Sequence, residues 1–406
     1  MKKQLPALTS LRFFAAAMIV VHHASGHFEA FKYLAKNYAL DQGVSFFFVL
    51  SGFILMYTHG NLSGAKNSIK FLWARIARIF PSHVTTMIAF YILWAYVFKT
   101  GYSPHISTTL TNLTLTQSWI PYPSYFFSYN GVSWSLSTEL FFYAMFPLLI
   151  VNIRKNWPLK LLFAVSLLGL SFLIISITSP PDVITGDIIT SASWLYIWPP
   201  ARLLEFVFGM LAGLVMMQKS DSLLGSRWSR TYGFIALTVM ICAGILVPDL
   251  SSWMLAHQWI SLPLAGWLNS SGAAPFFALG ILLLSVSKDF ITCVLSYKPL
   301  VWLGEISFSI YLTHQIIQKS LSIHPRWFAS MDQNVQMLGY CIFVIIVSFL
   351  LWRFIEKPAQ KLMLSPFKKN AITLVDELRV TSTTPTTSPP HHSARANPAG
   401  ESLARP

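Results

Sequence analysis

The sequence contains few charged residues for its length. Only 11% of its 406 residues are Asp, Glu, Lys or Arg, whereas 54% are hydrophobic. A soluble domain carries about twice that share of charges, which argues against a water-soluble globular protein. Cysteine is scarce too, because Cys242, Cys293 and Cys341 lie far apart in the sequence. They form no metal-ligand spacing and suggest no disulfide framework, so we expect neither a metal site nor a disulfide-stabilised domain.

The hydrophobic residues occur in blocks near the length of a bilayer-spanning helix. The sequence therefore predicts an all-α fold, a polytopic transmembrane helical bundle. We expect about ten spans, near residues 8–27, 43–60, 81–99, 134–152, 158–177, 201–218, 232–248, 272–287, 301–318 and 334–355.

Basic residues are missing from alternate connections between these spans. Stretches 100–132, 178–200 and 249–271 contain no Lys or Arg, whereas the other connections are basic. The exceptions weaken the pattern without reversing it; they are Lys32, Lys36, Lys99, Lys319 and Arg326. By the positive-inside rule, both termini are predicted to be cytoplasmic. This rule also accounts for the net charge of +14, so no nucleic-acid partner is expected.

The sequence contains no internal repeat. The C-terminal end is less hydrophobic than the rest of the chain. Residues 381–390 consist of Thr, Ser and Pro, and the rest of the end is rich in Ser, Pro, Ala and Arg. Such a composition does not bury a core. We therefore predict a transmembrane domain over residues 1–365 and a disordered cytoplasmic tail over residues 366–406.

Arg12 and His23 lie eleven residues apart in the first apolar segment. This spacing corresponds to about three helical turns, or about 16 Å along the axis, so the two side chains share one helix face. Ionisable groups at membrane depth are costly and usually mark a pathway or a reaction site. We interpret the pair as a ligand held near one membrane face and chemistry near the other. The side chain of His22 points about 100° away from that of His23, so we expect His22 to be a supporting or interfacial residue.

The predicted topology puts five ionisable residues at a similar depth near the outer side. For His23 with Glu139 we favour a general-base arrangement, because a buried His–carboxylate pair suits proton abstraction. Arg202 and Glu205 are i,i+3 neighbours, and we favour a simple structural ion pair for them. The five residues are His23, Glu139, Arg202, Glu205 and His314.

Arg75 and Arg78 form a second i,i+3 pair, within the sequence FLWARIARIF of a predicted short interfacial helix. Two interpretations remain open for them. They are topology anchors under the positive-inside rule, or they hold phosphate groups, which guanidinium binds bidentately. By contrast, Ser45, Ser51 and Gly52 are small residues expected to let a neighbouring helix approach closely.

The ordered set of motifs resembles the integral-membrane acyltransferase family 3 over most of residues 5–360. The family's Arg-x10-His, Ser-Gly-Phe and Arg-x2-Arg patterns match Arg12 to His23, Ser51 to Phe53 and Arg75 to Arg78. Further matches are Trp134, Ser135, Leu136, Glu139, Phe142 and Tyr143; Arg202, Glu205, Phe206 and Gly209; Gly304, Ile306, Ser307, Ser309, Tyr311, Leu312 and His314; and Glu356–Pro358. Two departures, Phe13 and Leu140, remove no catalytic group.

This resemblance implies transfer of an acyl group, usually acetyl, from cytoplasmic acyl-CoA to a carbohydrate hydroxyl outside a bacterial inner membrane. Acyl-CoA is then a donor substrate, and no permanently bound cofactor is expected. The implied partners are membrane lipids and a lipid-linked or exported saccharide; the oligomeric state stays open. The implied roles are catalysis by His23 and Glu139, CoA binding by Arg12, Arg75 and Arg78, and substrate binding or support by Tyr143, Arg202, Glu205 and His314.

Two other functions compete with the acyltransferase. A glycolipid transporter or flippase also has many spans and buried charges, but such proteins often contain two related halves, which this sequence lacks. A non-catalytic scaffold of polysaccharide export does not require the His23 and Glu139 pair. Within the enzymes, the acyl group could be succinyl or longer, and the acceptor sugar is not defined by the sequence.

Overall fold

The computed structural model describes residues 5–184, 186–323 and 330–365, and every regular element in this part of the chain is helical. The α-helices are α1 (Pro6–Ala24), α2 (Glu29–Asn37), α3 (Gln42–His59), α4 (Ala65–Ile92), α5 (Ile106–Leu113), α6 (Pro123–Phe126), α7 (Trp134–Leu149), α8 (Ile153–Thr178), α9 (Leu203–Gly225), α10 (Tyr232–Ala256), α11 (Leu262–Ser271), α12 (Ala274–Ser285), α13 (Phe290–Leu295), α14 (Lys298–Ile323) and α15 (Gln333–Leu351). Short π-helical turns include η1 (Leu93–Val97), η4 (Ser193–Ile197) and η8 (Trp352–Glu356).

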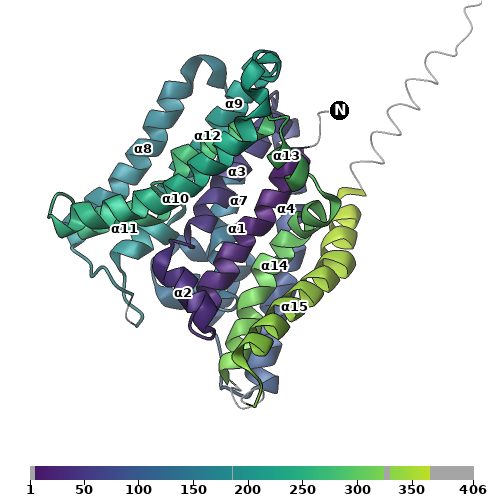
Figure 1. Ribbon diagram of the computed structural model, residues 1–406. Helices are drawn as coiled ribbons and strands as arrows, with labels where there is room; N and C mark the ends of the chain where they lie inside the picture. The colour runs from purple at the N-terminus through teal and green to yellow at the C-terminus, as the bar shows by residue number, and fades with distance from the viewer. Residues whose placement is uncertain (1–4, 185, 324–329, 366–406) are drawn as a thin grey trace, which may run out of the picture. The chain divides into compact units, whose positions relative to one another are not determined.

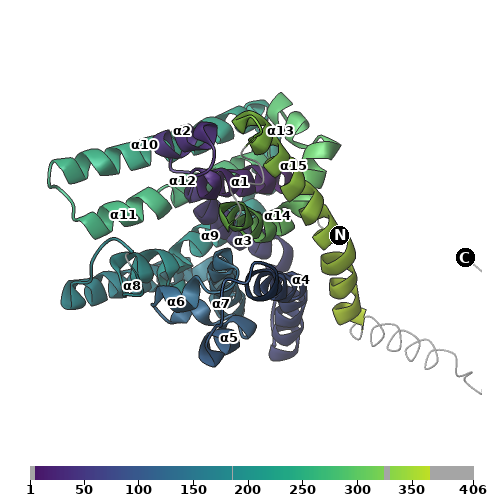
Figure 2. The same ribbon diagram turned by 90° about the horizontal axis from the view of Figure 1, so that it is seen from below.

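Helices α1, α3 and α14 form the centre of the bundle (Figures 1 and 2). Helix α1 packs along α14, and α3 packs along α9. Helix α15 lies at one edge, against α14, whereas α8, α10 and α11 lie at the opposite edge. Of the residues predicted to carry chemistry, Arg12, His23 and His314 come from these central helices. The others come from α4, α7 and the start of α9, which pack against the centre.

The expected class, a multi-pass bundle of membrane helices, is confirmed. Among the described residues, eight helical segments are long and apolar enough to cross a membrane. Two predicted spans, α7 and α14, are not among them. Helix α7 has only 16 residues, fewer than the ~20 that a bilayer requires. Helix α14 includes buried polar residues such as Ser307, Ser309 and His314, which its position in the protein interior permits.

The segment with Arg75 and Arg78 is not the separate short helix that the sequence predicted. It lies inside α4, which continues without a break past Pro81. Proline removes one backbone hydrogen bond from a helix interior. Packing against α7 and α14 holds the two parts of α4 together nevertheless. The two arginines consequently project from a long helix into the bundle.

Small residues allow α3 and α9 to approach until their backbones touch, as expected for Gly52. A Cβ atom on Gly52 would lie 2.0 Å from the carbonyl oxygen of Phe206. A Cβ atom on Gly209 would lie 1.9 Å from the carbonyl oxygen of Val49. No real Cβ contact is this short, so both positions require glycine, and the α3–α9 pair forms a rigid wall beside the centre of the bundle.

The described residues up to Leu362 form one compact unit, whose core combines side chains from both ends of this unit. The predicted tail, residues 366–406, lies outside the described residues. Its disorder and its cytoplasmic location stay predictions.

Candidate active site

A small cavity lies between α1, α3, α4, α7 and α14, and we call it the arginine cavity. Its volume is about 110 Å³, which corresponds to roughly three or four waters at ~30 Å³ each. The lining includes Arg12, Val44, Phe47, Ser51, Arg75, Arg78, Ser135, Glu139, Tyr143 and Tyr311. The RxxR motif thus joins Arg12 at one cavity, although more than sixty residues separate them in the sequence.

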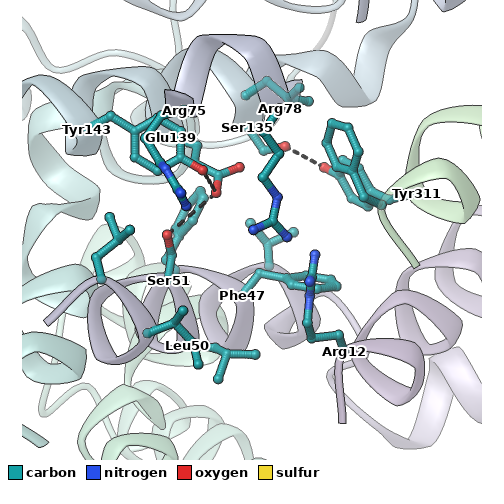
Figure 3. Close-up of a pocket in the computed structure, with 16 residues that line it drawn as sticks. Arg12, Phe47, Leu50, Ser51, Arg75, Arg78, Ser135, Glu139, Tyr143 and Tyr311 are labelled. Carbon is teal, nitrogen blue, oxygen red and sulfur yellow. Dashed lines mark hydrogen bonds between the residues drawn. The ribbon is translucent and has the colours of Figure 1, made fainter. Parts of the chain in front are cut away.

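Positive charge dominates the arginine cavity. Figure 3 shows the guanidinium groups of Arg12 and Arg78 pointing toward each other from opposite sides. The Arg75 Nε atom is buried without a hydrogen-bond partner among the described residues. Of the lining residues only Glu139 is acidic, so the cavity has two more positive than negative side chains. Such an arrangement favours binding of an anion.

Glu139 is held by hydroxyl groups in this cavity. Ser51 Oγ donates to Glu139 Oε1 at 3.5 Å, and the Tyr143 hydroxyl donates to the same oxygen. Both contacts are drawn in Figure 3. Ser51, expected only to provide close packing, therefore has a polar contact in the candidate site.

A second cavity adjoins the first, and we call it the histidine cavity. Its volume is about 430 Å³, within the ~300–1,000 Å³ typical of ligand pockets. The lining includes His22, His23, Asp41, Val44, Phe127, Trp134, Asp182, Tyr196, Trp267 and Tyr311. Both His22 and His23 border it, whereas the sequence assigned only His23 to the site.

His23 contacts His314 rather than a carboxylate. His23 Nδ1 lies 2.8 Å from His314 Nε2, and the two rings are stacked with their centroids 5.1 Å apart. His314 Nδ1 lies 3.2 Å from the carbonyl oxygen of Ile310. Since a carbonyl oxygen only accepts, His314 carries its proton on Nδ1 and its Nε2 accepts from His23 Nδ1. This pattern assigns the free lone pair of neutral His23 to Nε2, the atom a general base needs.

The predicted contact between His23 and Glu139 was wrong. Among the described residues, no hydrogen bond joins them, and they border different cavities. The physical reason lies in α7, where Trp134 borders the histidine cavity and Glu139, five residues further along, borders the arginine cavity. Five residues rise about 7.5 Å along a helix, enough to move Glu139 away from the level of His23.

Arg202 and Glu205 form the buried structural ion pair that the sequence favoured. Arg202 Nε and Nη2 donate to the two carboxylate oxygens of Glu205 at 2.7 and 2.9 Å. Arg202 Nη1 donates to the carbonyl oxygen of Tyr196 at 3.0 Å. All three nitrogen atoms have partners, so Arg202 positions Tyr196 in the cavity wall and does not itself line either cavity.

Sequence reasoning missed Asp41 and gave no role to Tyr311. Asp41 precedes α3 and borders the histidine cavity. Tyr311 and Val44 border both cavities, so they form the partition between them. The Tyr311 hydroxyl lies 2.8 Å from Ser135 Oγ and donates to the carbonyl oxygen of Val132 at 3.0 Å. The Ser-x-Tyr and Trp-Ser motifs carried a signal for Ser135 and Tyr311; nothing local in the sequence indicated Asp41.

Glu356 is a further acidic group near the arginines. It accepts a hydrogen bond from Ser309 Oγ at 2.8 Å and lies near enough to Arg12 and Arg78 to interact with their charges. The late Glu-Lys-Pro motif thus returns to the centre of the bundle, which explains why a residue so far along the sequence belongs to the site.

A known protein family matches nearly the whole chain. The family described as "acyltransferase domain" matches residues 5–353. The chain therefore belongs to the integral-membrane acyltransferase family 3 and is a multi-pass membrane acyltransferase by family.

Acyltransferases from several bacteria are similar to this chain in sequence. Acyltransferase MdmB of Streptomyces mycarofaciens is 27% identical, covering 89% of this chain and 92% of the relative. The putative peptidoglycan O-acetyltransferase YrhL of Bacillus subtilis is 26% identical, over 88% of this chain and 55% of the relative. Peptidoglycan O-acetyltransferase OatA of Listeria monocytogenes is 23% identical, over 89% and 56%. The chain thus spans little more than half of the two peptidoglycan relatives. No solved structure matches.

Proposed function

We propose that this protein transfers an acyl group, in the first instance acetyl, from acyl-CoA to a hydroxyl of a cell-surface or exported carbohydrate. The observation that carries the proposal is the pair of adjoining cavities. One is bordered by three arginines, and the other by a histidine whose Nε2 is free to accept a proton. They share a wall at Val44 and Tyr311.

The arginine cavity is the proposed site for a phosphate of the CoA donor. Arg12, Arg75 and Arg78 hold three positive charges close together, and Glu139 and the nearby Glu356 supply only two negative charges. A bound anion would offset the remaining positive charge. The volume of about 110 Å³ suits one phosphate-sized group rather than a whole CoA. The remainder of the donor would lie outside this cavity, with its thin arm reaching the partition at Tyr311.

The histidine cavity is the proposed site of the reaction. His23 Nε2 takes the proton of the acceptor hydroxyl as its oxygen attacks the thioester carbonyl. The C–S bond then breaks, and the CoA thiolate takes the proton back from His23, so that an ester and free CoA result. The protonated His23 keeps its Nδ1–H donating to His314 Nε2, which steadies the imidazolium through the step.

The acceptor and the compartment are proposed from the relatives. Two of them are named for peptidoglycan O-acetylation, one only putatively, which supports a surface carbohydrate as the acceptor. We place the protein in the bacterial inner membrane, with a lipid-linked or exported saccharide as partner. Succinyl or a longer acyl group is the alternative donor moiety.

The test uses purified protein and labelled acetyl-CoA. We expect Arg75→Ala and Arg78→Ala to raise the donor KM about tenfold or more, because each removes a charge-assisted contact worth roughly 1.5–3 kcal/mol. Arg→Lys changes at these positions should restore only part of the affinity, since lysine lacks the planar fork. Arg230→Ala, an exposed arginine outside both cavities, is the matched control.

Failure has a clear form. If wild-type protein consumes no acetyl-CoA but moves a labelled glycolipid between leaflets, the transporter interpretation replaces the enzyme. If acetyl-CoA is consumed and both alanine variants bind it as the wild type does, the arginines are topology anchors and the donor site lies elsewhere.

A further inference from the structure

The walls of the histidine cavity contain chemistry that the proton transfer does not use. Trp134, Tyr196 and Trp267 border it, and they come from α7, η4 and α11. Aromatic faces match the apolar C–H faces of a pyranose ring, while the rim of hydroxyl groups on such a ring requires polar partners. A volume of about 430 Å³ has room for a ring of this kind.

Charge distinguishes this cavity from its neighbour. Within the described part of the chain, its lining includes Asp41 and Asp182 and neither Lys nor Arg. The arginine cavity on the other side of Tyr311 has the opposite sign. Arg202, which lies close to Asp41, donates through each of its three nitrogen atoms to Glu205 or Tyr196 and does not line the cavity.

The two carboxylates still have acceptor capacity. Asp182 Oδ1 accepts from Ser191 Oγ at 2.6 Å, and no contact is recorded for its second oxygen among the described residues. Asp41 has no ion pair among the described residues, and its carboxylate interacts with the backbone N–H groups of Asp41 and Gln42. A carboxylate accepts several hydrogen bonds, so both side chains can hold hydroxyl groups of a ligand.

We propose that the histidine cavity binds the acceptor as a sugar ring without negative charge, and that Asp41 and Asp182 are the residues that exclude anionic sugars. Aromatic residues hold the ring, the carboxylates accept hydrogen bonds from its hydroxyl groups, and a uronic acid or a phosphorylated sugar is repelled. The two cavities thus sort their substrates by charge, with the anionic donor on the arginine side. The bound sugar is an acyl acceptor only if the proposed function holds. The binding of an uncharged sugar ring does not depend on that function.

Binding of two matched probes tests the inference without requiring turnover. The probes are methyl β-glucopyranoside and methyl β-glucuronide, which differ only in the carboxylate at C6. Their affinities are measured by ligand-observed NMR on the full chain in lipid nanodiscs, because the headgroup of a sugar detergent would compete. We expect the glucoside to bind about tenfold or more tightly than the glucuronide, since like-charge juxtaposition is strongly unfavourable at an interface.

Isosteric variants locate the cause. Asp41→Asn and Asp182→Asn should each narrow the difference between the probes by severalfold, chiefly by improving glucuronide binding. Trp267→Ala should weaken both probes, and Trp267→Phe should retain most of the affinity. Asp249→Asn, an exposed carboxylate on α10 outside the cavity, should change nothing.

The inference is overturned if neither probe binds, if the glucuronide binds as tightly as the glucoside, or if the two Asn variants match the Asp249→Asn control. Acetyl-CoA consumption is measured on the same preparation. Selective sugar binding without any acyl transfer would sink the proposed function and keep the cavity assignment. Acyl transfer without the charge preference would keep the proposed function and overturn the assignment of the histidine cavity.

Discussion

His23 and His314 form a single unit at the level of individual residues. Because His314 Nε2 accepts from His23 Nδ1, it fixes the ring of His23 and leaves Nε2 as the base. We predict that His23→Ala yields a folded protein whose kcat falls by about 10²–10⁴, the usual contribution of a general base. His22→Ala should retain substantial activity, although His22 borders the same cavity. Acyl-transfer rates of the purified variants measure this.

His314→Ala provides the companion measurement. If His314 acts through His23, the double variant should be no slower than His23→Ala alone, because residues that act as a unit are not additive. Independent, multiplying losses would contradict the pairing. A dead His22→Ala variant together with an active His23→Ala variant would reverse the assignment of the base.

Asp41 gives the cavity a predicted pH dependence. Burial raises the pKa of the Asp41 carboxyl above its usual range, despite the opposing charges of His22 and Arg202. The carboxylate is therefore present above this raised pKa and lost as the pH falls through it. We predict that the preference for methyl glucoside over methyl glucuronide shrinks as the pH falls, starting at a higher pH than an ordinary aspartate would give.

The control for this prediction is Asp41→Asn. His22, Arg202 and Tyr196, which also face Asp41, are unchanged in that variant. The part of the pH response that disappears is therefore due to Asp41. A response that is identical in Asp41→Asn and wild type would show that another group sets it.

Local spacing predicted some of these residues and could not predict others. Arg202 and Glu205 are three residues apart, so helix geometry alone brings them together. His23 and His314 are 291 residues apart, and their contact depends on how α1 packs along α14. Glu139 was expected at the depth of His23, because depth counted from a predicted span end says nothing about which neighbours a side chain meets.

At the level of helices, the sequence predicted the type of element better than the residues at which each helix begins and ends. The sequence divided α4 at Pro81, whereas the helix continues from Ala65 to Ile92. Helix α7 was expected as a full span and has only 16 residues. In both cases tertiary packing overrides the local signal, since a buried helix needs neither full apolarity nor full length.

The α3–α9 contact is the clearest prediction at this level. We expect Gly209→Ala to destabilise the protein by about 1–3 kcal/mol, the usual cost of overpacking. The added Cβ would lie 1.9 Å from the Val49 carbonyl oxygen, and a backbone atom cannot move aside as a flexible side chain can. Thermal unfolding of the variant in nanodiscs measures the loss.

Gly169→Ala is the matched control, because its Cβ would meet nothing within 4 Å on α8. It removes the same glycine freedom from a helix, and alanine is the better helix former, so no loss of stability is expected. Equal melting temperatures for the two variants would mean that α3 and α9 are less tightly packed than their backbones indicate.

At the level of the whole molecule, the class of fold followed from composition. With 11% charged residues and long apolar blocks, the chain had to be a helical membrane protein. The positions of the cavities did not follow, because each cavity is lined by elements from distant parts of the sequence. The charge of the loops predicts which side each cavity faces, and this orientation remains a prediction.

The last prediction concerns the side of the membrane from which each substrate enters. The basic loops predict that the N-terminal end of α1, with Arg12, lies toward the cytoplasm and that its other end, with His23, lies toward the outside. In sealed proteoliposomes of one orientation, acetyl-CoA should support transfer only from the side exposing the basic loops. The acylated saccharide should appear on the opposite side.

Leaky vesicles, in which both substrates reach both sides, are the control and should lose this asymmetry. Product on the same side as the CoA would contradict the loop-charge topology, because Arg12 and His23 would then open to one compartment despite lying three turns apart on one helix.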